Sequence, residues 1–204
     1  IKTIRSAGNS LLLLINDILD LSKIESGKLH IQLKSTNLYQ MIEEIGCVFE
    51  VDLKKKSLGF VLDIAPNVPK VVMLDEPRLR QVLFNLIGNA VKFTHEGTIT
   101  LKITARNDAD HQVNLGFYVE DTGVGISEDA QTVIFESFVQ PKGQDVVEYG
   151  GSGLGLAISK RLISLMLGEL TVQSKVGIGS TFSFVLPGVG VITQASPLYH
   201  EGLD

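Results

Sequence analysis

Cysteine is almost absent from this chain: Cys47 is the only one among 204 residues, and tryptophan does not occur at all. A single cysteine can form no internal disulfide, and a reducing compartment suits such a chain. Long apolar runs are also missing, because Asn16, Asp17 and Asp20 interrupt the densest one, residues 11–21, which is too short to span a bilayer. No secretion signal is visible. We therefore expect a cytoplasmic protein segment without membrane contact.

Basic residues are also fewer than acidic ones. The chain has 18 lysines and arginines against 23 acidic residues, which gives a net charge of −5. No basic field covers the molecule, so nucleic acid is not expected as a partner. The length fits one medium domain, or one domain with an appended helix. Because the chain begins at Ile1 rather than at methionine, we expect it to be a fragment of a longer protein.

Apolar periodicity and turn residues predict alternating helices and strands. Asn37 has the character of an N-cap with Gln40 in the reciprocal capping position, and Pro77 suits the first turn of a later helix. The predicted helices cover residues 4–25, 38–55, 77–93, 128–134 and 154–167, and the predicted strands cover residues 29–33, 58–64, 99–103, 113–119, 170–173 and 181–186. This order predicts an α+β fold, a two-layer α/β sandwich with a mixed sheet and its helices on one face.

The first predicted helix has a heptad-like apolar seam, and the helix ends at a C-cap glycine, Gly27. Leu12, Ile15 and Leu19 widen the stripe beyond a two-stranded seam, which favours a four-helix bundle formed by dimerisation. The alternative is a helix that folds onto the core of its own chain. The seam consists of Ile4, Ala7, Leu11, Leu14, Ile18 and Leu21.

Three polar or glycine-rich segments suggest a phosphate ligand. Residues 149–156 contain four glycines directly before a predicted helix, whose N–H groups and dipole would favour a phosphate. Asn85, Asn89 and Lys92 share one helix face, where amide oxygens suit Mg²⁺ and the ammonium suits phosphate; a solvent-facing polar strip is the alternative. Asp121 ends a strand before a glycine loop and could accept a hydrogen bond from an adenine amine, although an ordinary Asp-Thr-Gly turn would look the same.

Together these segments resemble the conserved boxes of sensor histidine kinases. Residues 78–94 (RLRQVLFNLIGNAVKFT) resemble the N box, and residues 121–126 (DTGVGI) resemble the first glycine box. Residues 135–138 (FESF) are similar to the F box, and residues 18–28 (ILDLSKIESGK) to the end of the dimerisation hairpin. The second and the last glycine boxes are matched by residues 151–156 (GSGLGL) and 177–182 (GIGSTF).

This resemblance implies a Bergerat-type ATP-binding fold that transfers the γ-phosphate of Mg²⁺-ATP to a histidine in two-component signalling. It also implies a homodimer formed through the N-terminal helix and a response-regulator receiver domain as partner. Residues 1–28 would be the second hairpin helix, residues 29–187 the ATP-binding domain and residues 188–204 a tail or linker.

The resemblance also assigns roles to individual residues. Asn85 and Asn89 would hold Mg²⁺ and the phosphates, Lys92 would contact phosphate, and Asn85 and Lys92 would be the catalytic pair. Residues 139–150 would form the ATP lid, hinged by Phe135 and Phe138. Adenine would be bound by Asp121, Gly123, Gly125 and Ile126, with Thr181 acting through water, and the phosphates by Gly151, Ser152, Gly153, Leu154 and Gly155.

Two departures from the family pattern keep alternatives open. No histidine of the chain (His30, His95, His111, His200) is followed by the family's Glu-x-x-Thr-Pro pattern, so we expect the acceptor upstream of Ile1. Val147 and Glu148 occupy lid positions that are often basic, although Lys142 could substitute. One alternative is therefore a degenerate kinase relative that binds nucleotide, or none, and works by heterodimerising through its N-terminal helix. A gyrase-type ATPase is the other, but it would need a glutamate in place of Asn85 to activate water.

Overall fold

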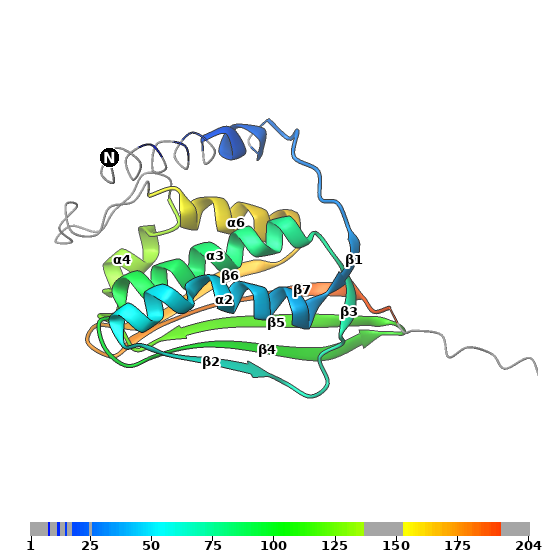
Figure 1. Ribbon diagram of the computed structural model, residues 1–204. Helices are drawn as coiled ribbons and strands as arrows, with labels where there is room; N and C mark the ends of the chain where they lie inside the picture. Colours follow the sequence, from blue (N-terminus) through cyan, green and yellow to red (C-terminus); the bar gives the residue numbers. More distant parts are fainter. Residues whose placement is uncertain are drawn as a thin grey trace, which may run out of the picture.

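The computed structural model describes residues 8, 12, 15, 18–24, 26–136 and 153–192. Its main feature is a five-stranded sheet in the order β2-β4-β5-β7-β6, and β1 and β3 form a separate two-stranded sheet (Figure 1). β2 is parallel to β4, and the other neighbouring strands of the large sheet are antiparallel. The strands are β1 (Lys34–Asn37), β2 (Gly59–Ile64), β3 (Val71–Leu74), β4 (Thr98–Ala109), β5 (Gln112–Asp121), β6 (Glu169–Lys175) and β7 (Gly179–Gly190). The helices are α2 (Leu38–Lys56), α3 (Glu76–Phe93), α4 (Glu128–Val133) and α6 (Gly155–Leu165).

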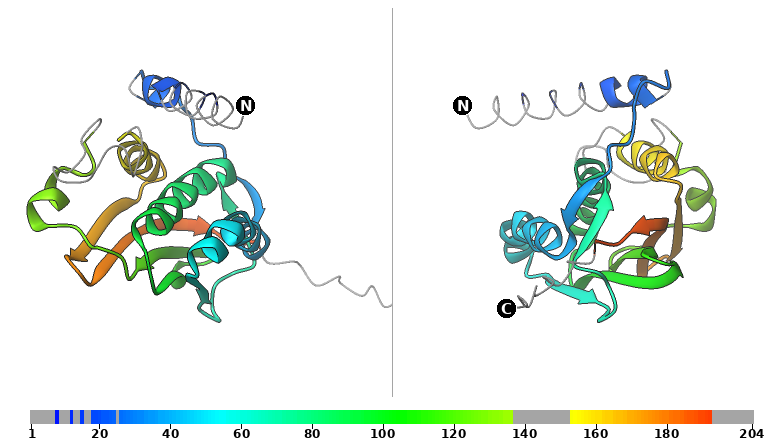
Figure 2. Two further views of the ribbon diagram at one scale, coloured as in Figure 1. Left: turned by 60° about the vertical axis from the view of Figure 1, so that its left-hand side comes forward. Right: turned by 90° about the vertical axis from the view of Figure 1, so that its right-hand side faces the viewer.

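Helices α2, α3 and α6 lie together on one face of the large sheet (Figures 1 and 2). Side chains alternate along a strand, so each strand sends every second residue toward the helices. On the helix-covered side of the sheet, Phe117 of β5 stacks on Phe184 of β7, with ring centroids 4.9 Å apart. Both rings are almost completely buried. The mixed sheet with helices on one face confirms the predicted fold class.

Helix α3 lies in the middle of the helical layer, and its sequence explains both its ends and its orientation. Asp75 caps the N-terminus by accepting a hydrogen bond from the Arg78 backbone N–H, and Pro77 lies in the first turn as predicted. At the other end Lys56 Nζ donates to the backbone carbonyl oxygens of Val91, Lys92 and Thr94. The buried side of the helix consists of Leu79, Val82, Leu83, Leu86, Ile87, Ala90 and Val91.

The predicted strand at residues 29–33 is wrong. The chain there is irregular, and the strand β1 begins at Lys34, where it pairs with the unpredicted strand β3. The alternation that suggested a strand reflects only loose packing, because Leu29 is buried whereas Leu33 is 59% exposed. Helix α2 begins after Asn37 as predicted, with the Asn37 side chain accepting from the Gln40 N–H. The Gln40 side chain donates to Glu44 instead of completing the capping box.

The predicted tail begins too early, because β7 continues to Gly190 and Val191 bridges to Val72. Pro187 suggested the end of the strand, since proline cannot donate to a sheet ladder. The β5–β7 register, however, shifts between the pairs Leu115–Leu186 and Val113–Val189, so Pro187 lies in a bulge where it interrupts no regular pair. Strands β4 and β5 are also longer than the predicted strands 99–103 and 113–119, and they join in a tight hairpin between Ala109 and Gln112.

The N-terminal helix contacts the remainder of the chain near the start of α3. It ends at the predicted cap, where Gly27 N donates to Ile24 O and Lys28 N donates to Lys23 O. Asp20 accepts from Gln81 Nε2 at 2.8 Å and lies 3.5 Å from Arg78 Nη1. Among the described residues of this helix (8, 12, 15 and 18–24), Leu21 and Ile24 pack against the core, whereas Leu12, Ile15, Ile18 and Leu19 are exposed.

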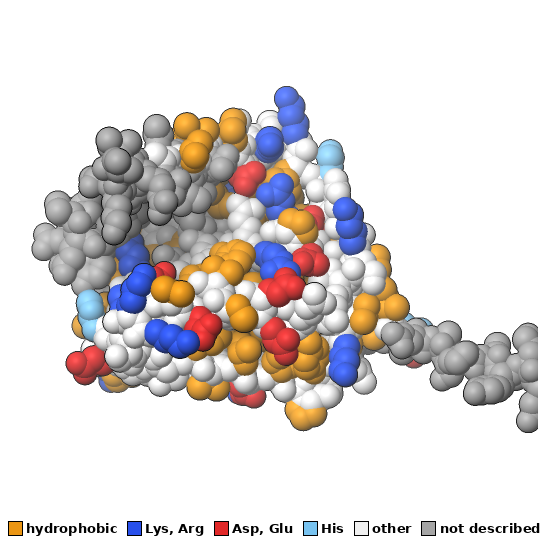
Figure 3. All heavy atoms as spheres, viewed as in Figure 1, with side chains coloured by type: hydrophobic (Ala, Val, Ile, Leu, Met, Phe, Trp, Pro, Cys, Tyr) orange, Lys and Arg blue, Asp and Glu red, His pale blue; other side chains and the backbone are white. Residues whose placement is uncertain are grey.

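The outward face of α2 mixes both signs of charge. Acidic and basic side chains alternate over this face in Figure 3, with apolar side chains between them. Two pairs follow the helical spacing, Glu50 with Lys54 and Asp52 with Lys55, and both are solvent-exposed. Such pairs contribute little to stability, so the face is a solvated surface rather than a stabilising network. Among the described residues no helix is both long and apolar enough to cross a membrane.

Asp75 provides a test of how the start of α3 is held. Its Oδ1 accepts from Arg78 N, and its Oδ2 accepts from Gln32 N at 2.8 Å in the segment that follows the N-terminal helix. Replacing this buried residue by alanine removes a cap and leaves a backbone donor unpaired, so D75A should lower the free energy of unfolding by about 2–3 kcal/mol in urea titrations. D75N keeps a capping oxygen and should lose less. Equal losses in the two variants would contradict the capping role.

Candidate functional site

Asn85, Asn89 and Lys92 form a polar row along one side of α3. The first of them, Asn85, lies against the first turn of α6. Its Nδ2 donates to Ser159 Oγ of α6 at 2.9 Å, and its Oδ1 lies where a Cβ on Gly155 would collide with it. Glycine is therefore required at the first position of α6, because only a bare backbone allows this approach. The structure thus places two predicted site residues, Asn85 and Gly155, in direct contact.

Asn89 and Lys92 follow Asn85 along the same side of α3, and both are partly buried. Lys92 Nζ lies 4.6 Å from the centroid of the Phe93 ring. Burial of the Lys92 side chain lowers the pKa of its ammonium group. The row therefore presents two amide side chains and one partly desolvated cation, and Asn85 at its start lies beside the first turn of α6.

The N-terminus of α6 offers backbone donors rather than a capping side chain. Leu154 occupies the N-cap position, makes no side-chain cap hydrogen bond and is completely buried in the core. The N–H groups of a first helical turn have no partner within the helix, and the positive end of the helix dipole lies there. Gly153 precedes this turn, whereas Gly151 and Ser152 lie outside the described residues.

Asp121 lies at the end of β5, where the first glycine loop begins. Gly123 N donates to Asp121 Oδ1 at 2.8 Å, and Ser180 donates to the same carboxylate through its backbone and its hydroxyl. Burial raises the pKa of Asp121, and these three donors offset part of the increase. The result is a carboxylate held in one orientation in a partly buried position.

The first glycine loop is wedged between α3 and the β6–β7 hairpin. Gly123 is packed so closely that a Cβ there would lie 2.5 Å from Phe93 O at the C-terminus of α3. On the other side Gly125 adjoins the backbone of Lys175, and Ile126 N donates to Ser174 Oγ. The predicted adenine residues Asp121, Gly123, Gly125 and Ile126 therefore form one loop that is attached to both neighbouring elements.

Thr181 is the predicted site residue that the structure does not bring to Asp121. The β5–β7 register pairs Asp121 with Ser180 and Glu120 with Thr181. Directly paired residues share a face of the sheet and consecutive residues alternate, so Thr181 lies on the face opposite to Asp121. Ser180, which is 7% exposed and which the sequence analysis missed, takes the position beside Asp121. Strand alternation from the buried Phe182 and Phe184 could have identified it.

Phe135, one of the two predicted hinge residues of the lid, is among the described residues. Its ring packs edge-on against Phe182, with centroids 6.4 Å apart, and Lys160 Nζ lies 5.0 Å from its centroid. Phe138 and the predicted lid at residues 139–150, with Lys142, Val147 and Glu148, lie outside the described residues.

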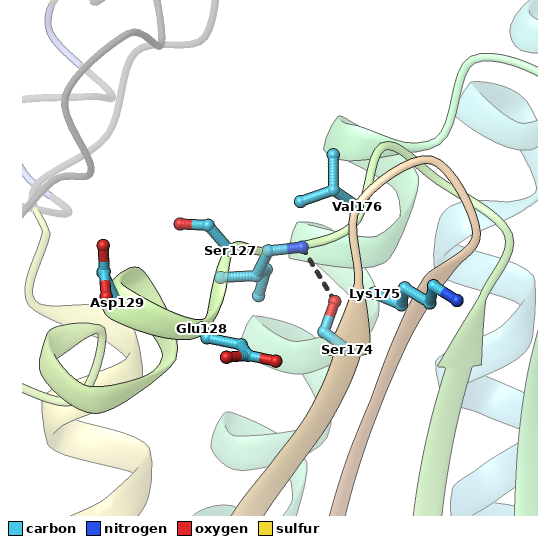
Figure 4. Close-up of a pocket in the computed structure, with 7 residues that line it drawn as sticks. Ser127, Glu128, Asp129, Ser174, Lys175 and Val176 are labelled. Carbon is cyan, nitrogen blue, oxygen red and sulfur yellow. Dashed lines mark hydrogen bonds between the residues drawn. The ribbon is translucent and has the colours of Figure 1, made fainter.

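A pocket of about 470 Å³ lies beside the first glycine loop, between this loop and the β6–β7 hairpin (Figure 4). Ile126 is its one residue in common with the predicted site. Charged side chains of both signs, Glu128, Asp129 and Lys175, line it, and the hydrogen bond from Ile126 N to Ser174 Oγ lies in its wall. The described residues contain no cluster of three His, Cys, Asp or Glu side chains that could hold a metal ion.

Comparison with known proteins identifies the family. Residues 74–189, more than half of the chain, match the family described as Histidine kinase-, DNA gyrase B-, and HSP90-like ATPase. The chain belongs to this family. Within it, the chain is the ATP-binding catalytic domain of a sensor histidine kinase, which confirms the resemblance drawn from its boxes.

Several histidine kinases are similar to this catalytic domain. It is 40% identical over 187 residues to Hybrid signal transduction histidine kinase B of Dictyostelium discoideum, an alignment that covers 92% of this chain and 10% of that protein. The chain thus spans about a tenth of the length of this relative.

Two solved structures share the fold. The crystal structure of full-length ShkA in complex with AMPPNP has a TM-score of 0.79 and 32% identity, and the match covers 97% of this chain and 39% of that one. The structure of the histidine kinase ThkA in complex with the response regulator protein TrrA has a TM-score of 0.63 and 25% identity over 92% of this chain and 50% of that one.

The raised pKa of Asp121 predicts a pH dependence for the stability of the histidine kinase domain. Because the folded carboxyl binds its proton more tightly than the unfolded one, its favourable contribution is complete below the ordinary value of 3.8 and is lost as pH rises through the raised pKa. In urea titrations without nucleotide, wild type should therefore lose stability relative to D121N over this range. A difference between the two proteins that stays constant with pH would contradict the assignment.

Proposed function

We propose that this domain transfers the γ-phosphate of Mg²⁺-ATP to a histidine of a dimerisation hairpin. The observation that carries the proposal is the contact of Asn85 with the first turn of α6, which joins an amide-bearing helix to a phosphate-binding helix N-terminus. The transfer itself needs little covalent chemistry from the protein, because positioning and charge stabilisation supply most of the catalysis.

Asp121 would recognise the adenine. Its carboxylate is oriented by the Gly123 N–H and by Ser180, and it can accept a hydrogen bond from the exocyclic amine of adenine. Partial burial of this carboxylate excludes competing water, so a ligand that lacks the amine would leave the group unpaired. Ile126 supplies an apolar side chain at the end of the same loop.

Asn85, Asn89 and Lys92 would bind the metal and the phosphates. Amide oxygens are hard donors of the kind that Mg²⁺ accepts together with phosphate oxygens and water, so the residues present fit the ion. The ion would neutralise phosphate charge, and Lys92 would contribute a further positive charge from the same helix side. The N–H groups at the start of α6 would face the phosphates.

Histidine phosphorylation is favoured over ATP hydrolysis by the nature of residue 85. Asparagine has no basic carboxylate with which to activate water, so the domain would retain ATP until a better nucleophile arrives. The acceptor histidine, a homodimer formed through the N-terminal helix and a cytosolic location are parts of the same proposal. The exposed apolar residues of that helix support the dimer. The ThkA complex with TrrA supports a response regulator as partner.

Calorimetry tests the adenine assignment. The wild-type chain should bind AMPPNP in the presence of Mg²⁺, and D121N should bind it at least about tenfold more weakly, because a charge-assisted hydrogen bond is lost. E120Q is a matched control, since Glu120 precedes Asp121 on the opposite face of the sheet. Its affinity should equal that of wild type. Absence of binding to wild type would overturn the proposed function, and equal binding by D121N would overturn the adenine assignment.

A turnover assay separates the kinase from a gyrase-type ATPase. With Mg²⁺-ATP and no acceptor, phosphate release should stay well below about 1 s⁻¹, the low end of ordinary enzyme turnover. Sustained hydrolysis at or above this rate would place the domain with the ATPases instead.

A further inference from the structure

Ser159 lies directly behind the predicted metal-binding residue Asn85. It is 2% exposed, in the middle of α6, and its hydroxyl accepts the hydrogen bond from Asn85 Nδ2 at 2.9 Å. Gly155 lies four residues earlier and therefore on the same side of the helix. The Asn85 amide spans these two residues, with its nitrogen at Ser159 and its oxygen at Gly155.

The orientation of this amide matters because its two ends are chemically opposite. The oxygen is an acceptor that can bind a cation, whereas the NH₂ group is a donor that a cation repels. A half-turn of the amide would exchange the two ends at Gly155, beside the N-terminus of α6. In the observed orientation the buried hydroxyl accepts from the nitrogen end of the amide. The opposite orientation would direct the NH₂ group toward the N–H groups at the start of α6, so the two neighbours together favour the oxygen at that end.

We propose that Ser159 is a positioning residue that directs Asn85 Oδ1 toward the metal-bound phosphates of the nucleotide. This inference rests on the proposed function, because it requires the metal to lie at the junction of α3 and α6. Ser159 would not touch the nucleotide itself. It would act by holding a ligand in the orientation that binding requires, as residues behind metal ligands generally do.

Binding measurements on S159A test the proposal. Loss of one hydrogen bond that orients a ligand should weaken Mg²⁺-AMPPNP binding about three- to tenfold in calorimetry. Binding of ADP without Mg²⁺ should weaken by a smaller factor, because the Asp121 loop would hold its adenine and no metal ion needs the Asn85 oxygen. S164A is a matched control: Ser164 lies on the same helix, but it is exposed and donates to Lys160 O, so its variant should behave as wild type in both titrations.

Three results would overturn the proposal. S159A could bind Mg²⁺-AMPPNP as tightly as wild type, it could weaken Mg²⁺-free ADP by the same factor, which would indicate a general distortion, or S164A could show the same selective loss.

NMR of the Asn85 side-chain amide gives a readout that needs no nucleotide. Its two N–H signals, assigned by their disappearance in N85D, should move toward solvent-exposed values in S159A and stay in place in S164A. Unmoved signals in S159A would overturn this inference even if the wild-type chain binds nucleotide normally. Conversely, a wild-type chain that binds no nucleotide would overturn the proposed function, while the amide signals would still report whether Ser159 orients Asn85.

Discussion

The site depends on how firmly one side of α3 is buried. Seven apolar side chains of this helix are buried against the sheet and the neighbouring helices. Six of them are leucine, isoleucine or valine, and full burial of such a side chain is worth about 1.5–3 kcal/mol relative to exposure, so no other rotation of α3 about its axis is competitive. The rotation fixes where the polar row points. Asn85 consequently faces α6, and Asn89 and Lys92 follow it.

Both ends of α3 are attached to segments that belong to other parts of the fold. At its start, Asp75 binds the backbone of Gln32, and Gln81 binds Asp20 of the N-terminal helix. At its end, Lys56 binds three backbone carbonyls, and Phe93 O accepts from Val124 N of the first glycine loop. The same rigid element therefore contacts the N-terminal helix at one end and the Asp121 loop at the other. A displacement of either end of α3 would therefore shift the positions of Asn85, Asn89 and Lys92 between them.

The sequence predicted the elements whose signals are local and missed those that depend on pairing. Helix α3 was predictable because its apolar period and its first-turn proline lie within the helix itself. Strand β3 was missed because its four residues pair with β1, more than thirty residues earlier in the chain, and because Val72 also bridges to the distant Val191. Pro187 was misread because a bulge, which depends on the partner strand, makes it acceptable within β7. Thr181 was named and Ser180 was missed for the same reason: which residue lies beside Asp121 is decided by the register between β5 and β7, not by the motif itself.

The start of α6 shows how a binding role can explain a locally unfavourable sequence. Helices α2 and α3 begin with side-chain caps from Asn37 and Asp75, whereas α6 begins with Leu154, which cannot cap. A serine or aspartate at this position would stabilise the helix by about 1 kcal/mol, but its side chain would occupy first-turn N–H groups that a phosphate needs. Burial of Leu154 in the core offsets the missing cap by anchoring the helix start without a polar group. Gly155 then brings the bare first turn against Asn85. Leucine and glycine at these two positions therefore fix the start of α6 in place without a side-chain cap on its first-turn N–H groups.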